Sequence, residues 1–418
     1  MKKIIFATFV VVLCCAPALT QTIAITNAKI YPVSGPSITG TVVIRDGVIA
    51  AIGENVSVPA NAQRIDATGK VVTPGLINSL SELGLIEIDQ VRTTNDTSAR
   101  GNNNVAAAFK VWDGLNPASA LFAPARNEGI TSAIIIPHGG LISGQAAAID
   151  LVSSGRADEM VRRAAVAMVA QVDDTNAAGT TSRGELIGKL RTLFEDVKFY
   201  VEHQRDYERA ASRPLSASQA DLDALIPVLN GRMLLLIDAN RVDEIDAALS
   251  LARDYNLKIG ITGGAEAWLR ADRLAAAKVP VFTGAMNNIP DSFATLNQRQ
   301  ENAALLRRAG VQVVITGGGD VTRYNARNIK YEAGNAVAYG MTHDDALRAL
   351  TLTPAEIFGL SDRLGSLQVG RDANVVIWSG DPFEFSTLAD RVFIRGREVK
   401  EPSRQDLLIE RYKSKATR

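Results

Sequence analysis

The feature that most constrains the fold is a series of near-continuous apolar segments in the middle of the chain, each ending in Gly, Asp or Pro. They read GITSAIIIP, RMLLLIDA, KIGITGG, VPVFTG and VQVVITGG, and helical patterns such as RVDEIDAALSLARDY and AEAWLRADRLAAAK separate several of them. Apolar strands that alternate with helices predict an α/β fold with a parallel sheet buried on both faces. A stretch of about 285 residues fits a (β/α)8 TIM-like barrel. A doubly wound open sheet is the alternative, but no glycine-rich nucleotide fingerprint follows an early strand.

Both ends of the chain have a different pattern. The segments TIAITNAKIYPVSG, TVVIRDGVIAAIGE and AQRIDATGKVVTPG near the start alternate apolar and polar residues, as half-buried strands do. Asp46-Gly47 lies between two such runs and predicts a hairpin turn. Near the end, GSLQVGRDANVVIWSG and DRVFIRGREV predict further short strands. Neither end has enough apolar surface to form a sheet alone, so we expect strands from both ends to pair into one small discontinuous β-sandwich.

The first twenty residues have the layout of a signal peptide. Two lysines precede an apolar run from Ile4 to Cys15, and Ala-Pro-Ala follows it. This pattern predicts a cleavable signal over residues 1–20 and a secreted or periplasmic protein. A membrane anchor and a lipoprotein are the alternatives, but the run is short for an anchor and the residues before Cys14 make a poor lipid-attachment box. Cleavage removes both cysteines, so the mature chain has no thiol for a disulfide or for a cysteine-ligated zinc.

The charge balance excludes one class of partner. Lys plus Arg and Asp plus Glu each number 45, so no basic footprint for nucleic acid is present. No internal stretch approaches the roughly 20 apolar residues of a transmembrane helix, so we expect no such helix in the mature chain. The length of 418 residues is too great for one small domain and favours a large domain with a smaller one.

Three stretches carry a family resemblance. They are IRDGVIAAIGE with IDATGKVVTPGLI, then NEGITSAIIIP, then ALRALTLTPAEIFGLSDRLGSLQVGRDANVVIWSGDPFE. Their content and order resemble the amidohydrolase superfamily, particularly its imidazolonepropionase-like branch. The resemblance implies a metal-dependent hydrolase fold with a barrel over residues 73–360. It also implies a small β domain from residues 21–72 and 361–402, followed by a C-terminal tail over 403–418.

The resemblance implies metal-ion catalysis, because the family holds one or two divalent cations at the C-terminal mouth of the barrel. Its ligands are a His-x-His pair at strand one, single histidines after strands five and six, and an aspartate after strand eight that also serves as general base. Here the run VVTPGLI leads to Asn78, Leu80 and Glu82, where the family has Asp, His and His. A leucine side chain supplies no lone pair to a metal.

The later ligand positions differ as well. Asp238 stands where the histidine of strand five is expected, and Thr262 stands at the strand-six position. Strand eight has Thr316 at the expected place, with Asp320 four residues later as the candidate catalytic acid. The chain has three histidines, none at a ligand position: His138, His203 and His343. Because imidazole is the ligand that holds a transition metal at neutral pH, we expect the usual zinc site to be absent.

His138 is the candidate ligand-binding residue. It follows an apolar strand directly in IIIPHGGLISGQ, so its loop can reach the barrel mouth. The alternative is a structural histidine, because the sequence places no carboxylate or metal partner beside it. His203 and His343 lie in charged helical patterns, where a solvated position on a helix is the simplest interpretation.

The remaining candidates are carboxylates. If the family alignment holds, Glu82, Asp238 and Asp320 project near the same mouth. Bunched carboxylates repel unless a cation is present, and an all-oxygen site suits Mg²⁺ or Ca²⁺ better than zinc. The alternative is that arginines such as Arg323 or Arg327 neutralise these acids in salt bridges.

Two functions of different classes follow. The first is an exported amidohydrolase-like pseudoenzyme that has lost its metal site and binds a small molecule or a partner, either a homo-oligomer or a catalytically active homologue. The second is an active amidohydrolase that acts on cyclic amides or small peptides through a carboxylate-based metal site. Fold is weak evidence for activity, so the missing histidines favour the first function. No G-x-S-x-G elbow suggests a serine nucleophile instead.

Overall fold

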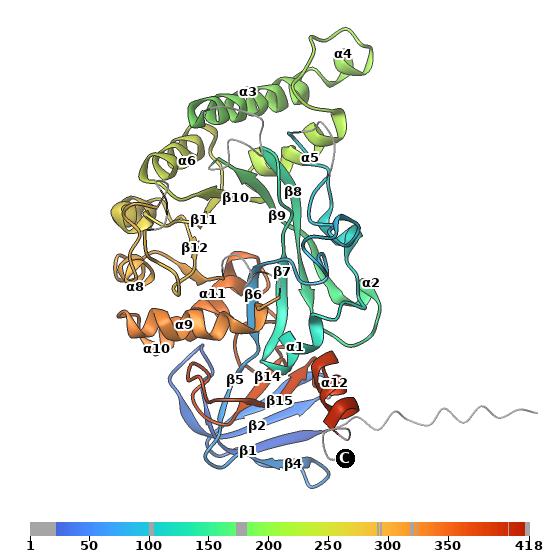
Figure 1. Cartoon of the computed structure of the whole chain (residues 1–418), viewed down its shortest axis with the longest axis vertical. Coiled ribbons are helices and arrows are strands. Elements are labelled where there is room, and N and C mark those ends of the chain that lie inside the picture. The colour runs from blue at the N-terminus through green and yellow to red at the C-terminus, as the bar shows by residue number, and fades with distance from the viewer. Residues whose placement is uncertain are drawn as a thin grey trace, which may run out of the picture.

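The protein is built from two eight-stranded sheets that lie end to end (Figure 1). The computed structural model describes residues 22–99, 104–172, 182–290, 292, 295–317, 322, 324–399 and 401–413. The predicted signal peptide lies outside these residues. Within them, no helix is long and apolar enough to cross a membrane.

The small sheet combines both ends of the chain, as predicted. Its order is β16-β15-β14-β5-β1-β2-β3, with β4 paired to β1. The N-terminal strands are β1 (Ile23–Ile30), β2 (Ile38–Arg45), β3 (Val48–Gly53), β4 (Gln63–Asp66) and β5 (Val71–Pro74), and the C-terminal strands are β14 (Val375–Trp378), β15 (Ala389–Ile394) and β16 (Arg397–Val399). The two sets meet where β5 pairs antiparallel with β14, and Val71 lies opposite Trp378. The predicted sandwich is not confirmed, because all eight strands belong to one sheet.

The predicted hairpin turn is confirmed. Arg45 pairs with Val48 across the β2–β3 connection, and Asp46 and Gly47 have φ angles of 54° and 79°. Two successive positive φ angles are typical of the tight turn whose twist matches that of the flanking strands.

The large sheet follows the chain in order and forms a nearly closed barrel. Its strands are β6 (Leu76–Ser81), β7 (Ile130–Ile135), β8 (Ile142–Asp150), β9 (Val161–Gln171), β10 (Leu234–Ala239), β11 (Ile259–Gly263), β12 (Val281–Thr283) and β13 (Val313–Ile315). Its hydrogen-bonded ladders run without interruption from β6 to β13. The first and last strands are joined instead by the loop after β13, where the backbone carbonyl of Thr322 accepts the N–H of Glu82 at 2.8 Å.

The expectation of a purely parallel (β/α)8 barrel is wrong at β8. This strand runs antiparallel to both β7 and β9. Only residues 136–141 separate β7 from β8. A parallel connection needs about a dozen residues or more, so this short link permits only an antiparallel return.

Helices cover much of the outer face of the large sheet. They are α1 (Phe122–Asn127), α2 (Ala157–Met160), α3 (Arg183–Glu202), α4 (Gln204–Glu208), α5 (Gln219–Leu229), α6 (Val242–Tyr255), α7 (Ala271–Ala276), α8 (Asn302–Arg308), α9 (Ile329–Ala338), α10 (His343–Ala349) and α11 (Leu352–Ile357). Figure 1 shows α3 at the end of the molecule opposite the small sheet. Part of the predicted C-terminal tail forms one more helix, α12 (Arg404–Lys413), which buries no residue.

The inside of the barrel is filled by an apolar layer. Ile77, Ile134, Leu236, Phe282 and Val314, each from a different strand, form one buried cluster with residues in and just after α11. The ring of Phe358 lies 5.6 Å from that of Phe282. This packing fills the interior below the C-terminal ends of the strands, so any site of the family type must lie above it, at the mouth.

Candidate functional site

The barrel mouth is lined by the residues that follow the apolar layer on each strand. Side chains two positions apart on a strand face the same side. Asp238 follows Leu236, Thr316 follows Val314, and Thr262 follows Gly260 in this way. The mouth therefore changes from an apolar interior to a ring of polar side chains.

Asp238 has no histidine beside it on the neighbouring strands. In the sheet register its partners are Gln171 on β9 and Thr262 on β11. Asp238 is half-buried, and Thr262 is buried. The positions that the resemblance assigns to metal ligands on strands five and six thus supply a carboxylate and a hydroxyl at adjacent places.

Glu82 and His138 come together at the mouth. Glu82 Oε1 lies 2.9 Å from His138 Nε2, a distance typical of an ion pair, although the two groups lack the alignment of a hydrogen bond. The other carboxylate oxygen of Glu82 accepts the hydroxyl of Thr322 at 3.2 Å. The backbone N–H of His138 donates to Thr97 at 2.8 Å, which fixes the loop. His138 therefore has the carboxylate neighbour that the sequence did not reveal.

Leu80 takes the place of a family histidine and packs into the apolar cluster inside the barrel. Its φ angle of 62° lies in the left-handed region, which is uncommon for a residue with a Cβ atom. Asn78 is completely buried, and neither atom of its amide meets a hydrogen-bonding protein group within the described residues. The first strand thus presents an apolar group and a neutral amide where the family has a histidine and an aspartate.

The other predicted site residues lie elsewhere or outside the described part of the chain. Asp320 and Arg323 fall outside it, and Arg327 is exposed. His343 begins α10 and lies 3.1 Å from Asp381, whose pKa it lowers through this hydrogen bond. His203 ends α3, where its ring stacks on Phe199 at 4.2 Å.

The residues present do not fit the family's zinc centre. Among the residues that the structure describes, no three His, Cys, Asp or Glu side chains are grouped closely enough to hold a metal ion. Leu80 cannot ligate, and the side chains at the strand-five and strand-six positions offer oxygen only. A structural or catalytic zinc site uses nitrogen or sulfur ligands in most of its positions.

Two features of this region had no signal in the sequence. Thr322 contacts Glu82 across the gap between β13 and β6, but no motif singles it out. A cleft of about 630 Å³ also lies beside α3, lined mostly by residues between Glu185 and Asp221, where no sequence motif indicates a site.

Comparisons with known proteins find amidohydrolases. A model of the amidohydrolase family matches residues 270–400. The amidohydrolase tasK of Hapsidospora irregularis is 23% identical over 389 residues, which cover 85% of this chain but 39% of that protein. The chain therefore spans well under half of that relative. An imidazolonepropionase of Rhizobium rhizogenes is 22% identical over 427 residues, covering 89% of this chain and 97% of that one.

A solved structure gives the same assignment. The crystal structure of an amidohydrolase from Thermotoga maritima MSB8 superposes with a TM-score of 0.82 and 27% identity, covering 91% of this chain and all of the other. The match extends over both the barrel-like sheet and the small sheet. The chain belongs to the amidohydrolase superfamily.

Proposed function

We propose that this protein keeps the amidohydrolase scaffold but binds a ligand at the barrel mouth without hydrolysing it. The observation that carries the proposal is the contact between Glu82 and His138, together with Leu80 packed into the interior. The side chain at the second family histidine position already contacts another protein side chain. The side chain at the first has no ligand atom.

The chemistry of the mouth supports binding. The side chain of His138 is 36% exposed, so a molecule at the mouth can reach the ring while Glu82 and the backbone contact to Thr97 hold it in place. Asp238 and Thr262 add a carboxylate and a hydroxyl on the neighbouring strand ends. An apolar interior beneath a few convergent polar groups is the usual composition of a small-molecule site.

A second candidate is an active hydrolase with a carboxylate-based metal site. The observation that favours it is the presence of two acids, Glu82 and Asp238, on inward positions of the same barrel. The two candidates differ in metal content and in turnover, so one experiment separates them.

The test is elemental analysis of the mature protein purified without chelator, together with assays on dihydropyrimidine-like cyclic amides and acyl-amino-acid amides. We expect neither stoichiometric zinc or iron nor turnover. The double variant Leu80→His, Glu82→His should gain no activity, because the strand-five and strand-six ligands are still absent. One metal ion per chain that is lost, together with activity, in Glu82→Ala or Asp238→Ala would establish the second candidate. Asp344→Ala, at a side chain that is 83% exposed, is the matched control.

We also propose that the protein is exported, on the basis of the sequence pattern at residues 1–20. N-terminal sequencing of the protein from its natural host should find a first residue near position 19 or 21. A soluble cytoplasmic pool that retains Met1 would exclude export.

A further inference from the structure

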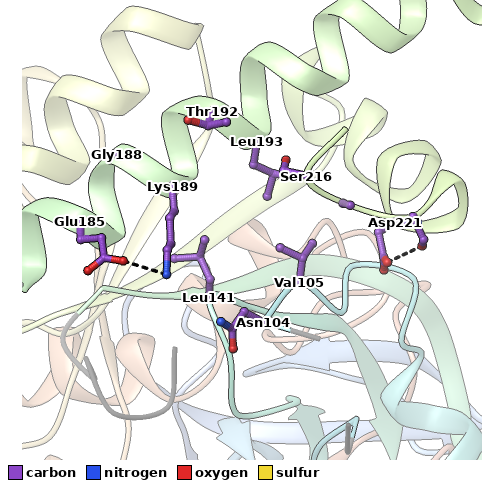
Figure 2. A pocket seen from close by; sticks show the side chains of 12 residues that line it. Asn104, Val105, Leu141, Glu185, Gly188, Lys189, Thr192, Leu193, Ser216 and Asp221 are labelled. Atoms are coloured by element: carbon purple, nitrogen blue, oxygen red, sulfur yellow. Dashed lines mark hydrogen bonds and ion pairs between the residues drawn. The ribbon is translucent and has the colours of Figure 1, made fainter. Parts of the chain in front are cut away.

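The cleft beside α3 has a defined place in the fold. Glu185, Lys189 and Leu193 of α3 form one wall, and Asn104, Val105 and Leu141 lie across from them (Figure 2). The segment Ser216–Ser218 closes one side. With a volume of about 630 Å³, the cleft is in the size range of small-molecule sites.

The cleft offers one charged pair above an apolar surface. Lys189 Nζ lies 3.0 Å from a carboxylate oxygen of Glu185, one helical turn away on α3. The two side chains are 38% and 44% exposed, so water screens the pair and it separates at little cost. The side chains of Val105, Leu141 and Leu193 supply the apolar surface.

The other acid of the cleft is already engaged in holding the wall together. Asp221 Oδ1 accepts the backbone N–H of Ala108 at 2.9 Å, and its Oδ2 accepts the hydroxyl of Ser218. The Ser218 hydroxyl in turn caps α5 by accepting the N–H of Asp221. The exchangeable charges that face a ligand are therefore those of Glu185 and Lys189.

We propose that this cleft binds the zwitterion of an apolar α-amino acid. Its ammonium group would pair with Glu185 and its carboxylate with Lys189, while its side chain covers the apolar surface of Val105, Leu141 and Leu193. Such a ligand replaces one ion pair by two and leaves no charge unpaired. A ligand with one net charge would pair with one member only and would forgo the second ion pair.

The cleft is distinct from the barrel mouth but shares a loop with it. The loop between β7 and β8 contains both His138, which contacts Glu82, and Leu141, which lines the cleft. Leu141 donates its N–H to the carbonyl of Asn104 at 2.7 Å, across the floor of the cleft. A Cβ atom on Gly140 would lie 2.9 Å from that carbonyl, so glycine permits the close approach. The proposal does not depend on the function of the mouth.

The experiment uses the mature full-length protein and isothermal titration calorimetry with L-leucine, N-acetyl-L-leucine and L-leucine amide. The acetyl group removes the ammonium charge and the amide removes the carboxylate charge, while the apolar side chain is unchanged. We expect L-leucine to bind. Each blocked form should bind at least about tenfold more weakly, because each loses one charge-assisted contact. Lys189→Met and Glu185→Gln should each weaken L-leucine binding to a similar degree.

Lys198→Met is the matched control. It removes the same charge from the same helix, where Lys198 pairs with Glu195 at 3.5 Å outside the cleft. Circular dichroism establishes that all variants are folded, and L-leucine binding to Lys198→Met should equal that of the wild type. Absence of L-leucine binding, equal affinity for the blocked forms, or wild-type affinity in Lys189→Met would each overturn the proposal. None of these results bears on metal content or turnover, so the two proposals fail separately.

Discussion

At the scale of single residues, the most instructive side chain is Glu332 of α9. Its carboxylate is buried and accepts the backbone N–H groups of Ala285 at 2.6 Å and Met286 at 2.7 Å, which fixes the loop after β12. Burial raises the pKa of Glu332 even though these two donors favour the charged form. The folded state therefore holds this proton more tightly than the unfolded state does.

Because the pKa of Glu332 differs between the folded and unfolded states, the unfolding free energy should depend on pH in a specific way. As pH rises from the ordinary glutamate value of 4.5 through the raised pKa, the wild type should lose unfolding free energy relative to Glu332→Gln, which does not titrate. Urea unfolding of both proteins at several pH values measures this difference. Asp381→Asn should give the opposite sign, because His343 lowers the pKa of Asp381 and its contribution is lost as pH falls below 3.8. If the unfolding free energy of the wild type minus that of Glu332→Gln stays constant or rises with pH, the raised pKa of Glu332 is contradicted.

Individual residues of the candidate site can be predicted from the sequence, but their contacts cannot. The replacement of a family histidine by Leu80 is readable from sequence, as are Glu82, His138 and Asp238 as individual candidates. The contact between Glu82 and His138 is not readable, because the two residues follow different strands and only the parallel pairing of β6 with β7 brings those strand ends together. Thr322 is not readable either, because it contacts Glu82 across the gap between β13 and β6, two strands at opposite ends of the sheet order.

At the scale of elements, a buried ionic cluster joins the β8–β9 hairpin to the small sheet. The carboxylate of Asp150 at the end of β8 is completely buried and accepts Nε of Arg162 at 2.9 Å and Nε of Arg395 at 2.7 Å. Arg162 also reaches Asp372 at 2.6 Å. One acid thus holds arginines from both sheets.

Replacing this acid should loosen the junction. Asp150→Asn keeps the size of the side chain but leaves Arg162 and Arg395 without their shared charge, so the unfolding free energy should fall by about 2–4 kcal/mol. Urea unfolding measures it. Asp254→Asn is the control, because Asp254 pairs with Arg191 on the surface, where water screens the pair and the loss of stability should be much smaller. Equal effects of the two substitutions would show that the cluster has no special role.

Most elements were predictable, and β8 shows why one was not. The short apolar strands and the helix over 242–255 follow from periodicity alone. The direction of β8 depends on the length of the link before it. The family pattern places a helix between successive strands and so predicts a parallel strand, whereas the link of residues 136–141 is too short for a parallel connection. The nearby stretch 151–160 contains only the four-residue helix α2.

At the scale of the whole molecule, the two ends of the chain stabilise each other. Val375, Ile377 and Phe393 from the C-terminal strands share one buried cluster with Ile25, Val42 and other residues of the N-terminal strands. The joining of the ends was predicted from the shortage of apolar surface at each end. The arrangement of all eight strands in a single sheet was not predicted, because sequence patterns specify strands but not how many sheets they form.

Truncation after Gly365 tests this dependence. Loss of the residues after Gly365, which include β14, β15 and β16, would expose the edge of β5 and remove five of the fifteen buried residues of the shared cluster. Limited proteolysis should therefore cut within residues 22–72, which should resist cleavage in the full chain. Truncation after Ser403 is the control, because it removes only α12 and the residues after it, and α12 buries nothing. N-terminal strands that remain protected after the longer truncation would refute the shared sheet.

The pairing of β5 with β14 also determines when the protein can finish folding. The hairpin of β2 and β3 can form as soon as its residues leave the ribosome, but β5 must wait for a strand about three hundred positions later. At a synthesis rate of about 5–20 residues per second, that delay is roughly 15–60 s. During this interval one edge of the nascent sheet has no strand partner and is open to pairing with other chains. The strands that are made first are thus among the last to be completed.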